Sequence, residues 1–204
     1  MLSYLAGSIS AGIIAGKLLK GIDIRNHGSG NAGATNIYRI FGWKAGFGVL
    51  LFDVFKGFFA ARYLAPWLAS ASHLEIVMML AGFASVLGHV FPVFAGFRGG
   101  KGVATLGGVL LAVNWPSAAI GFLVFLGFAL CTGIASLASI AAAITVPVSF
   151  IFYYKGQSHL VYGASFLIPV FVILTHRSNV KRIIRGEESA FRKKKPVSSH
   201  ENNP

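Results

Sequence analysis

Acidic residues are scarce in this chain: Asp and Glu together number 6, against 18 Lys and Arg, and only 12% of the 204 residues are charged. That share is about half that of an ordinary soluble domain. With 55% hydrophobic residues, the composition excludes both a soluble globular protein and a disordered chain. A single cysteine, Cys131, excludes an internal disulfide and a cysteine-based metal site. With so few acids and no ligand cluster in the sequence, we expect neither a metal nor another cofactor.

The net charge of +12 narrows the class of partner. In a soluble protein it would suggest nucleic acid. In a chain this apolar it favours anionic lipid head groups and phosphate-bearing small molecules. We therefore expect a lipid bilayer and small-molecule substrates as partners, no nucleic acid, and no obligate protein partner.

Apolar runs separated by short polar islands predict an all-α, polytopic integral membrane protein with about seven transmembrane helices. The runs cover residues 1–19, 45–68, 74–94, 103–113, 117–130, 134–154 and 160–174. Because runs of about 11 to 15 residues are short for a hydrocarbon core of ~30 Å and can be re-entrant, five or six full spans are an alternative. Residues 1–190 would form a single transmembrane domain, and 191–204 a basic, disordered cytoplasmic tail.

The distribution of charge predicts the orientation of these spans. No Lys or Arg precedes the first run, so we expect a retained span and not a cleaved signal peptide. With seven spans, 15 of the 18 Lys and Arg residues share one side, which also carries every glycine-rich island. The positive-inside rule then places the N-terminus outside and the C-terminus in the cytoplasm, as in a multi-pass protein of the bacterial inner (plasma) membrane.

The first island, residues 20–44, is rich in glycine and in groups that bind anions. Its glycines permit close backbone approach, and Arg25 and Arg39 supply forked cationic donors that suit phosphate. If a helix begins near Ala34, Asn36 and Arg39 lie on one face of it. The alternative interpretation is a flexible polar loop between two spans.

The second island, residues 96–102, is a glycine-rich turn that precedes an apolar run. Such a turn at the start of a helix presents free N–H groups and the positive end of the helix dipole to a phosphate, and Lys101 adds a point charge. It is not a Walker A loop, because Ala95 replaces the leading glycine and Gly102 the Ser or Thr. A basic anchor at the membrane interface is the alternative. His89, nearby, is by itself more typical of a satisfied helix histidine than of a catalyst.

The third island, residues 175–188, follows the last apolar run. His176 and Asn179 are spaced i,i+3, so they share a helical face, and the basic residues after them suit interfacial anchoring. Within an earlier run, Asp53 and Lys56 are also three apart, where charge is expensive. They either pair with each other or support a site electrostatically.

Together the three islands resemble the motifs of the bacterial acyl-phosphate:glycerol-3-phosphate acyltransferase family (PlsY). Residues 28–42 (GSGNAGATNIYRIFG) resemble its first motif, residues 88–105 (GHVFPVFAGFRGGKGVAT) its second, and residues 176–188 its third. The element from Asp53 to Gly57 also fits, and the likeness runs from about Met1 to Glu188. The departures are Arg98 in place of a lysine, Thr175 in place of an arginine, and residues 133–135 in place of a segment resembling Arg-Tyr-Val.

The resemblance implies an enzyme that moves the acyl group of an acyl phosphate to the 1-hydroxyl of sn-glycerol 3-phosphate. The products would be lysophosphatidate and phosphate, in the first step of phospholipid synthesis. The islands and the resemblance together assign catalytic roles to Ser29, Arg39, Lys101, His176 and Asn179. They assign substrate binding to Asn31, Thr35, Asn36, Arg98, Gly99, Gly100, Gly102, Ser139 and Glu188.

Because an acyl phosphate already carries a good leaving group, we expect direct attack by the glycerol hydroxyl. His176 is a candidate general base, although a substrate phosphate could take the same proton, and Ser29 as a nucleophile is a further alternative. Two other classes share some of these features: a transporter for a small anion or phosphate ester, and a structural anchor that binds anionic lipid. No histidine is followed five residues later by Asp, which argues against an acyl-CoA enzyme of the soluble type.

Overall fold

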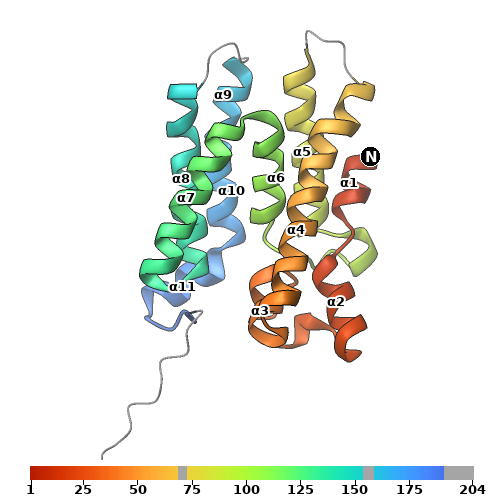
Figure 1. Ribbon diagram of the computed structural model, residues 1–204, viewed down its shortest axis with the longest axis vertical. Coiled ribbons are helices and arrows are strands. Elements are labelled where there is room, and N and C mark those ends of the chain that lie inside the picture. Colours follow the sequence, from red (N-terminus) through yellow and green to blue (C-terminus); the bar gives the residue numbers. More distant parts are fainter. Residues whose placement is uncertain (69–72, 154–158, 191–204) are drawn as a thin grey trace, which may run out of the picture.

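The computed structural model describes residues 1–68, 73–153 and 159–190, and within them the chain is all-helical, as the composition predicts (Figure 1). The helices are α1 Leu2–Gly7, α2 Ala11–Lys20, α3 Ala34–Phe41, α4 Trp43–Phe59, α5 Leu74–Val90, α6 Val103–Val113, α7 Trp115–Thr132, α8 Ala135–Tyr153, α9 His159–Ser165, α10 Leu167–Thr175 and α11 Arg177–Ile184. Single 3₁₀ turns lie at Ile24–Asn26, Ala65–Leu68 and Val93–Ala95, and a π-helical turn at Ala60–Leu64 continues α4.

Every apolar run of the sequence overlaps at least one of these helices, but not every run is long enough to cross a bilayer. Four segments of the described residues are long and apolar enough: Leu2–Lys20, Leu74–Ala95, Trp115–Thr132 and Ala135–Tyr153. A fifth is added if α9, α10 and α11 count as one span, bent by 66° between α10 and α11. With 11 residues, α6 is shorter than the roughly 20 that a span needs. The segment of α4 and its π-helical continuation carries Asp53, Lys56 and Arg62 and is not among the apolar segments. Seven spans, and their orientation, stay predictions.

The helices pack as two groups with α6 between them (Figure 1). On one side α1 packs on α5 and α3 on α4, and on the other α7 packs on α8. Glycine lets α6 lie directly against the backbone of α4, because a Cβ on Gly57 would lie 2.0 Å from the Thr105 carbonyl oxygen. A Cβ on Gly108 would likewise lie 1.9 Å from the Val54 carbonyl oxygen. The position of α6 is therefore tied to that of α4.

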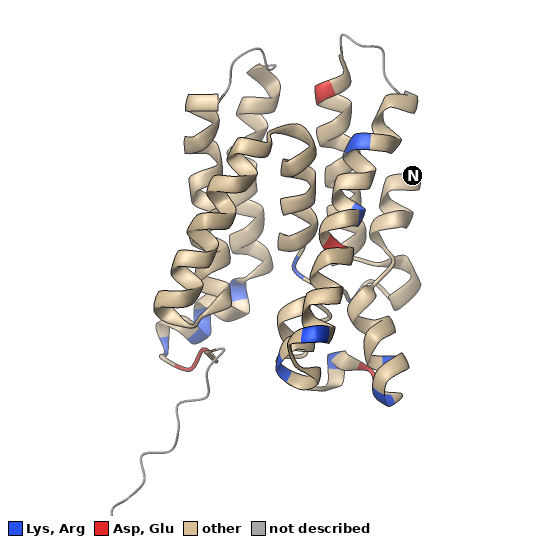
Figure 2. Cartoon of the chain, in the orientation of Figure 1, with Lys and Arg blue, Asp and Glu red and all other residues tan. Residues whose placement is uncertain are grey.

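Charge gathers at one end of the bundle, which carries α3 and α11 and which we call the basic end (Figure 2). The N-terminus lies away from it (Figure 1). The large exposed side chains of the other parts of the outer surface are mostly apolar, such as Phe55, Leu80 and Leu123, as expected of helices facing lipid. Lys155 and the basic run 192–195 lie outside the described residues, as does the predicted tail 191–204.

Candidate functional site

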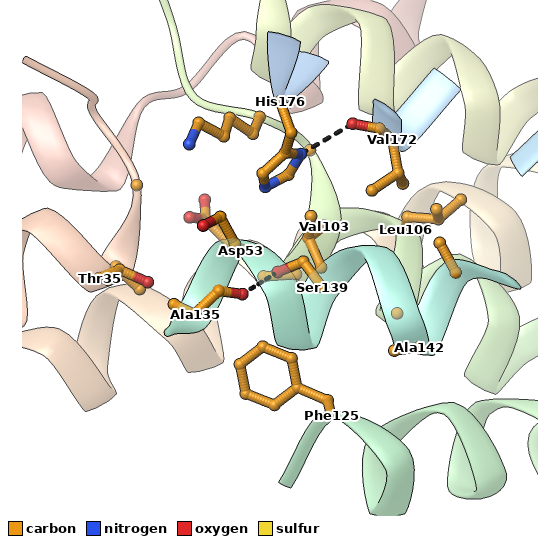
Figure 3. Close-up of a pocket in the computed structure, with 18 of the residues that line it drawn as sticks. Thr35, Asp53, Val103, Leu106, Phe125, Ala135, Ser139, Ala142, Val172 and His176 are labelled. Carbon is orange, nitrogen blue, oxygen red and sulfur yellow. Dashed lines mark hydrogen bonds between the residues drawn. The ribbon is translucent and has the colours of Figure 1, made fainter. Parts of the chain in front are cut away.

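A cavity of about 300 Å³ lies between α3, α4 and α6 on one side and α7, α8 and α10 on the other (Figure 3). Towards the basic end its walls are polar. Deeper in the bundle they are apolar, formed by residues of α4, α6, α7, α8 and α10. One cavity thus joins a cationic compartment to a hydrophobic one.

The structure brings most of the predicted site residues into this cavity. Eleven of the 14 line it: Ser29, Asn31, Thr35, Asn36, Arg39, Lys101, Gly102, Ser139, His176, Asn179 and Glu188. Arg98, Gly99 and Gly100 are not among its lining residues. Arg98 is exposed, while a Cβ on Gly99 or Gly100 would lie 2.0 Å from an atom of His89. The two glycines therefore have a packing reason to lack a side chain.

The second island forms a turn that ends at the start of α6, as its sequence predicts. Gly102 is the N-cap of α6 and has φ +84°, in the left-handed region that glycine adopts without a Cβ clash. Lys101 immediately precedes it. The arrangement presents the positive end of the α6 dipole and an ammonium group to the same part of the cavity.

Lys101 is partly buried, and its ammonium group donates a hydrogen bond to Oδ1 of Asn179. Burial lowers the pKa of Lys101 from 10.5 to about 8; the Glu188 carboxylate acts to raise it, whereas Arg182 and Arg39 act to lower it. The amine is therefore charged at neutral pH but closer to losing its proton than an ordinary lysine.

Glu188 joins two helices, α8 and α11, at the basic end. Its carboxylate accepts hydrogen bonds from Ser136 Oγ of α8 at 2.7 Å, from Asn179 Nδ2 of α11 at 2.5 Å and from Arg182 Nε at 2.6 Å. Burial acts to raise the pKa of Glu188, but these hydrogen bonds outweigh it and the pKa is lowered. The next residue, Ser189, accepts a hydrogen bond from Arg39 of α3 through its carbonyl oxygen. The segment after α11 thereby links both sides of the cavity.

His176 lies at the bend between α10 and α11, and its side chain is 3% exposed. Its Nδ1 lies 2.8 Å from the Val172 carbonyl oxygen (Figure 3). A carbonyl only accepts, so Nδ1 carries the proton of the neutral ring and Nε2 keeps its lone pair. That nitrogen is able to accept a proton.

The first island is folded around Asn36, which is 1% exposed. Its Oδ1 accepts from the Ser29 backbone N–H at 2.9 Å, and its Nδ2 lies 2.9 Å from the carbonyl oxygens of His27 and of Asn31. Both polar atoms of the Asn36 side chain are therefore hydrogen-bonded to the protein backbone. Although Asn36 lines the cavity, it shapes the loop that carries Ser29.

Arg25 is engaged with the protein in the same way and is not among the residues lining the cavity. It pairs with Asp23 at 2.7 Å, and its Nη1 donates to the Ala95 carbonyl oxygen at 2.6 Å and to that of Arg98 at 3.2 Å. The hydrogen bond from Arg25 lowers the pKa of Asp23 to about 2. Suggested from sequence as a phosphate ligand, Arg25 instead ties the first island to the second.

The apolar walls continue to the lateral surface of the bundle. Leu50 of α4 and Phe122 of α7 both line the cavity, and they are 38% and 60% exposed. Phe125 lies across the cavity from His176 (Figure 3). The hydrophobic compartment is therefore open to the surface that faces lipid.

The cavity is also lined by three polar residues that were not predicted as site residues: Asp53, His89 and Ser136. Ser136 lies three residues before Ser139, so the helical period could have found it. Asp53 and Lys56 form an ion pair at 2.8 Å. This is the first of the two alternatives considered for them, in which they pair with each other. His89 is the satisfied helix histidine that the sequence favours, since its Nδ1 lies 2.8 Å from Lys56 Nζ of α4.

Comparison with known proteins points to one family. A family model described as glycerol-3-phosphate acyltransferase matches residues 1–186. A curated protein of that name from Bacillus subtilis is 47% identical over 190 residues, covering 92% of this chain and 93% of its own. Another of that name, from Chlorobaculum tepidum, is 41% identical over 218 residues, covering 93% of each chain.

Solved structures agree. The crystal structure of PlsY (YgiH), an integral membrane glycerol 3-phosphate acyltransferase, in its glycerol 3-phosphate form superposes with a TM-score of 0.84 at 42% identity, covering 94% of this chain and 92% of that one. Its lysophosphatidic acid form gives a TM-score of 0.80 at 40% identity, covering 92% and 91%.

Proposed function

The chain belongs to the glycerol-3-phosphate acyltransferase family, and on that premise we propose that it transfers the acyl group of an acyl phosphate to the 1-hydroxyl of sn-glycerol 3-phosphate. The products are lysophosphatidate and inorganic phosphate. The observation that carries the proposal is the single cavity, which joins a cationic, glycine-lined compartment to an apolar one. A reaction between a phosphate ester and a lipid acyl donor needs both compartments at one place.

Two phosphates have to be held beside one carbonyl carbon, and the basic end supplies the groups for this. Lys101 and the N-terminus of α6 offer an ammonium group and free N–H groups, and Arg39 lines the same cavity from α3. Fixing two reactants in one geometry can by itself supply about 7–11 kcal/mol of the barrier reduction. Positive charge beside the carbonyl and the leaving phosphate stabilises the charge that develops there.

In the proposed step the glycerol 1-hydroxyl attacks the carbonyl carbon directly. A new carbon–oxygen bond forms, the bond to phosphate breaks, and phosphate leaves with the electron pair. The hydroxyl proton passes to His176 Nε2 or to a phosphate oxygen of a substrate. In the described residues the Ser29 hydroxyl has no hydrogen bond to a base, and this favours direct attack over a covalent serine intermediate.

The acyl chain of the donor lies along the apolar walls of α7 and α8. Gly121, Phe122 and Phe125 from α7 and Ala142 and Val146 from α8 line that part of the cavity. The opening beside Leu50 and Phe122 lets the chain enter from the bilayer.

We place the basic end in the cytoplasm of a bacterial inner membrane, with the N-terminus outside, because most Lys and Arg lie at that end (Figure 2). Cys131, the only cysteine of the chain, is exposed near the end of α7 on that side. A membrane-impermeant maleimide should therefore label inside-out vesicles and leave intact spheroplasts unlabelled. Labelling of spheroplasts alone would reverse the orientation.

The reaction is tested with purified protein, a long-chain acyl phosphate and labelled glycerol 3-phosphate, by looking for labelled lysophosphatidate. A parallel tube contains acyl-CoA. Product from the acyl phosphate alone is the expected result. Product from acyl-CoA alone would overturn the proposed donor, and no product from either, with folding shown intact, would favour a transporter for a phosphate ester.

A further inference from the structure

Beneath the glycine-rich turn lies a buried cluster of three ionisable side chains, Asp53 and Lys56 of α4 and His89 of α5. They are 2%, 4% and 6% exposed. The Lys56 ammonium lies 2.8 Å from Asp53 Oδ1 and 2.8 Å from His89 Nδ1, and it donates to the Ile9 carbonyl oxygen at 3.1 Å. Ile9 lies in the break between α1 and α2, so the cluster joins three parts of the fold.

His89 contacts both members of the ion pair. Its Nδ1 lies 2.8 Å from the Lys56 ammonium, with which it forms a hydrogen bond, and 3.3 Å from Asp53 Oδ1. The ring is held by this hydrogen bond in one orientation.

The turn that carries Lys101 rests on this ring. The Gly100 N–H donates to the His89 carbonyl oxygen at 3.1 Å, and the Gly99 N–H donates to that of Val90 at 3.1 Å. A Cβ on Gly100 would lie 2.0 Å from His89 Nε2. The backbone immediately before Lys101 is thus in direct contact with both the main chain and the imidazole of His89.

A buried ion pair commonly adds little net stability, because desolvation offsets the attraction between the charges. The contacts of the Asp53–Lys56 pair with His89 indicate a role other than stabilising the fold. We propose that His89, held by Lys56 and Asp53, is a positioning residue that sets the place of Gly100 and thereby of the Lys101 ammonium in the cavity. The inference deepens the proposed function and rests on it, since Lys101 is taken to act on substrate phosphate.

The test is a double-mutant cycle between His89 and Gly100, with kcat/KM for glycerol 3-phosphate and the melting temperature measured for each protein. A displacement of about 1 Å in a positioned group can cost about 100-fold in rate, so His89→Ala and Gly100→Ala should each lower kcat/KM by about that factor. In the double variant the added methyl group occupies the space left by the ring. Adding Gly100→Ala to the His89→Ala protein should then lower kcat/KM by no more than about twofold. If the two substitutions acted independently, it would lower kcat/KM by the same factor as in the wild type.

His73→Ala is the matched control, because His73 is exposed and precedes the opposite end of the same helix, α5. It should leave kcat/KM unchanged. If His89→Ala does not fold, His89→Asn is used instead: its amide oxygen can still accept from Lys56, but it has no ring against Gly100. We expect it to keep the wild-type melting temperature and to lose activity.

The outcomes separate this inference from the proposed function. If the wild-type enzyme is active and the effects of His89→Ala and Gly100→Ala on kcat/KM are strongly coupled, both the proposed function and the positioning role are supported. An active wild-type enzyme with fully independent single effects, or with His89→Asn within about threefold of wild type, overturns the positioning role alone. A folded wild-type enzyme that forms no lysophosphatidate overturns both.

Discussion

The pKa of Lys101 leads to a prediction about the alkaline limit of activity. The proposed role needs the ammonium form, and burial brings its pKa to about 8. The charged fraction is then about nine-tenths at pH 7 and about one-tenth at pH 9, whereas a lysine with its ordinary pKa would stay almost fully charged at pH 9. Since kcat/KM reports ionisations of the free enzyme, kcat/KM for glycerol 3-phosphate should fall about tenfold between pH 7 and pH 9.

The assay measures initial rates of labelled lysophosphatidate formation at low glycerol 3-phosphate, from pH 6.5 to about 10. Enzyme-free tubes correct for alkaline hydrolysis of the acyl phosphate. Lys101→Arg is the matched control: its guanidinium stays charged throughout, so the alkaline fall should disappear even though the geometry, and hence the absolute rate, is altered. A wild-type profile that stays level up to pH 10, or an arginine variant with the same fall, would refute the reasoning.

Three further predictions concern other parts of the site. Lys101→Ala should nearly abolish turnover while the protein still inserts and folds, as measured by membrane fractionation; wild-type activity would exclude the assigned role. Gly121→Leu should lower kcat/KM for long-chain acyl phosphates about tenfold more than for short-chain ones, because the new side chain fills the apolar compartment. Asn36→Ala should lower the free energy of unfolding by about 1–2 kcal/mol and reduce the melting temperature, since the partly buried backbone groups bonded to Asn36 lose their partner.

Local pattern was enough to predict much of the fold. The apolar runs locate the helices other than α3 and α11, and the glycine-rich turn before Val103 predicts the start of α6. The start of α3 at Ala34 matches the condition under which Asn36 and Arg39 share a face. These features depend on neighbours in sequence, through helical propensity, capping and glycine conformation. The family likeness, based on three motifs, is confirmed by the match over residues 1–186.

What could not be predicted depends on contacts between distant segments. Nothing local shows that Glu188 accepts from Ser136, 52 residues away, or that Arg25 donates to Ala95, 70 residues away. For the same reason the partner that satisfies His89 could not be named from the sequence, because Lys56 lies on another helix. Arg25 carried the right chemistry for phosphate, but it is engaged by the protein itself.

Because of the lateral opening beside Leu50 and Phe122, the relevant concentration of a lipid donor is its concentration in the membrane. A lipid donor that enters from the side arrives by diffusion in two dimensions, so its supply depends on its mole fraction in the leaflet and not on its amount per litre. Diluting the donor with inert lipid at constant total amount would slow the reaction, although nothing in the aqueous phase had changed. On the proposed function, the lipid product would leave by the same route, directly into the leaflet.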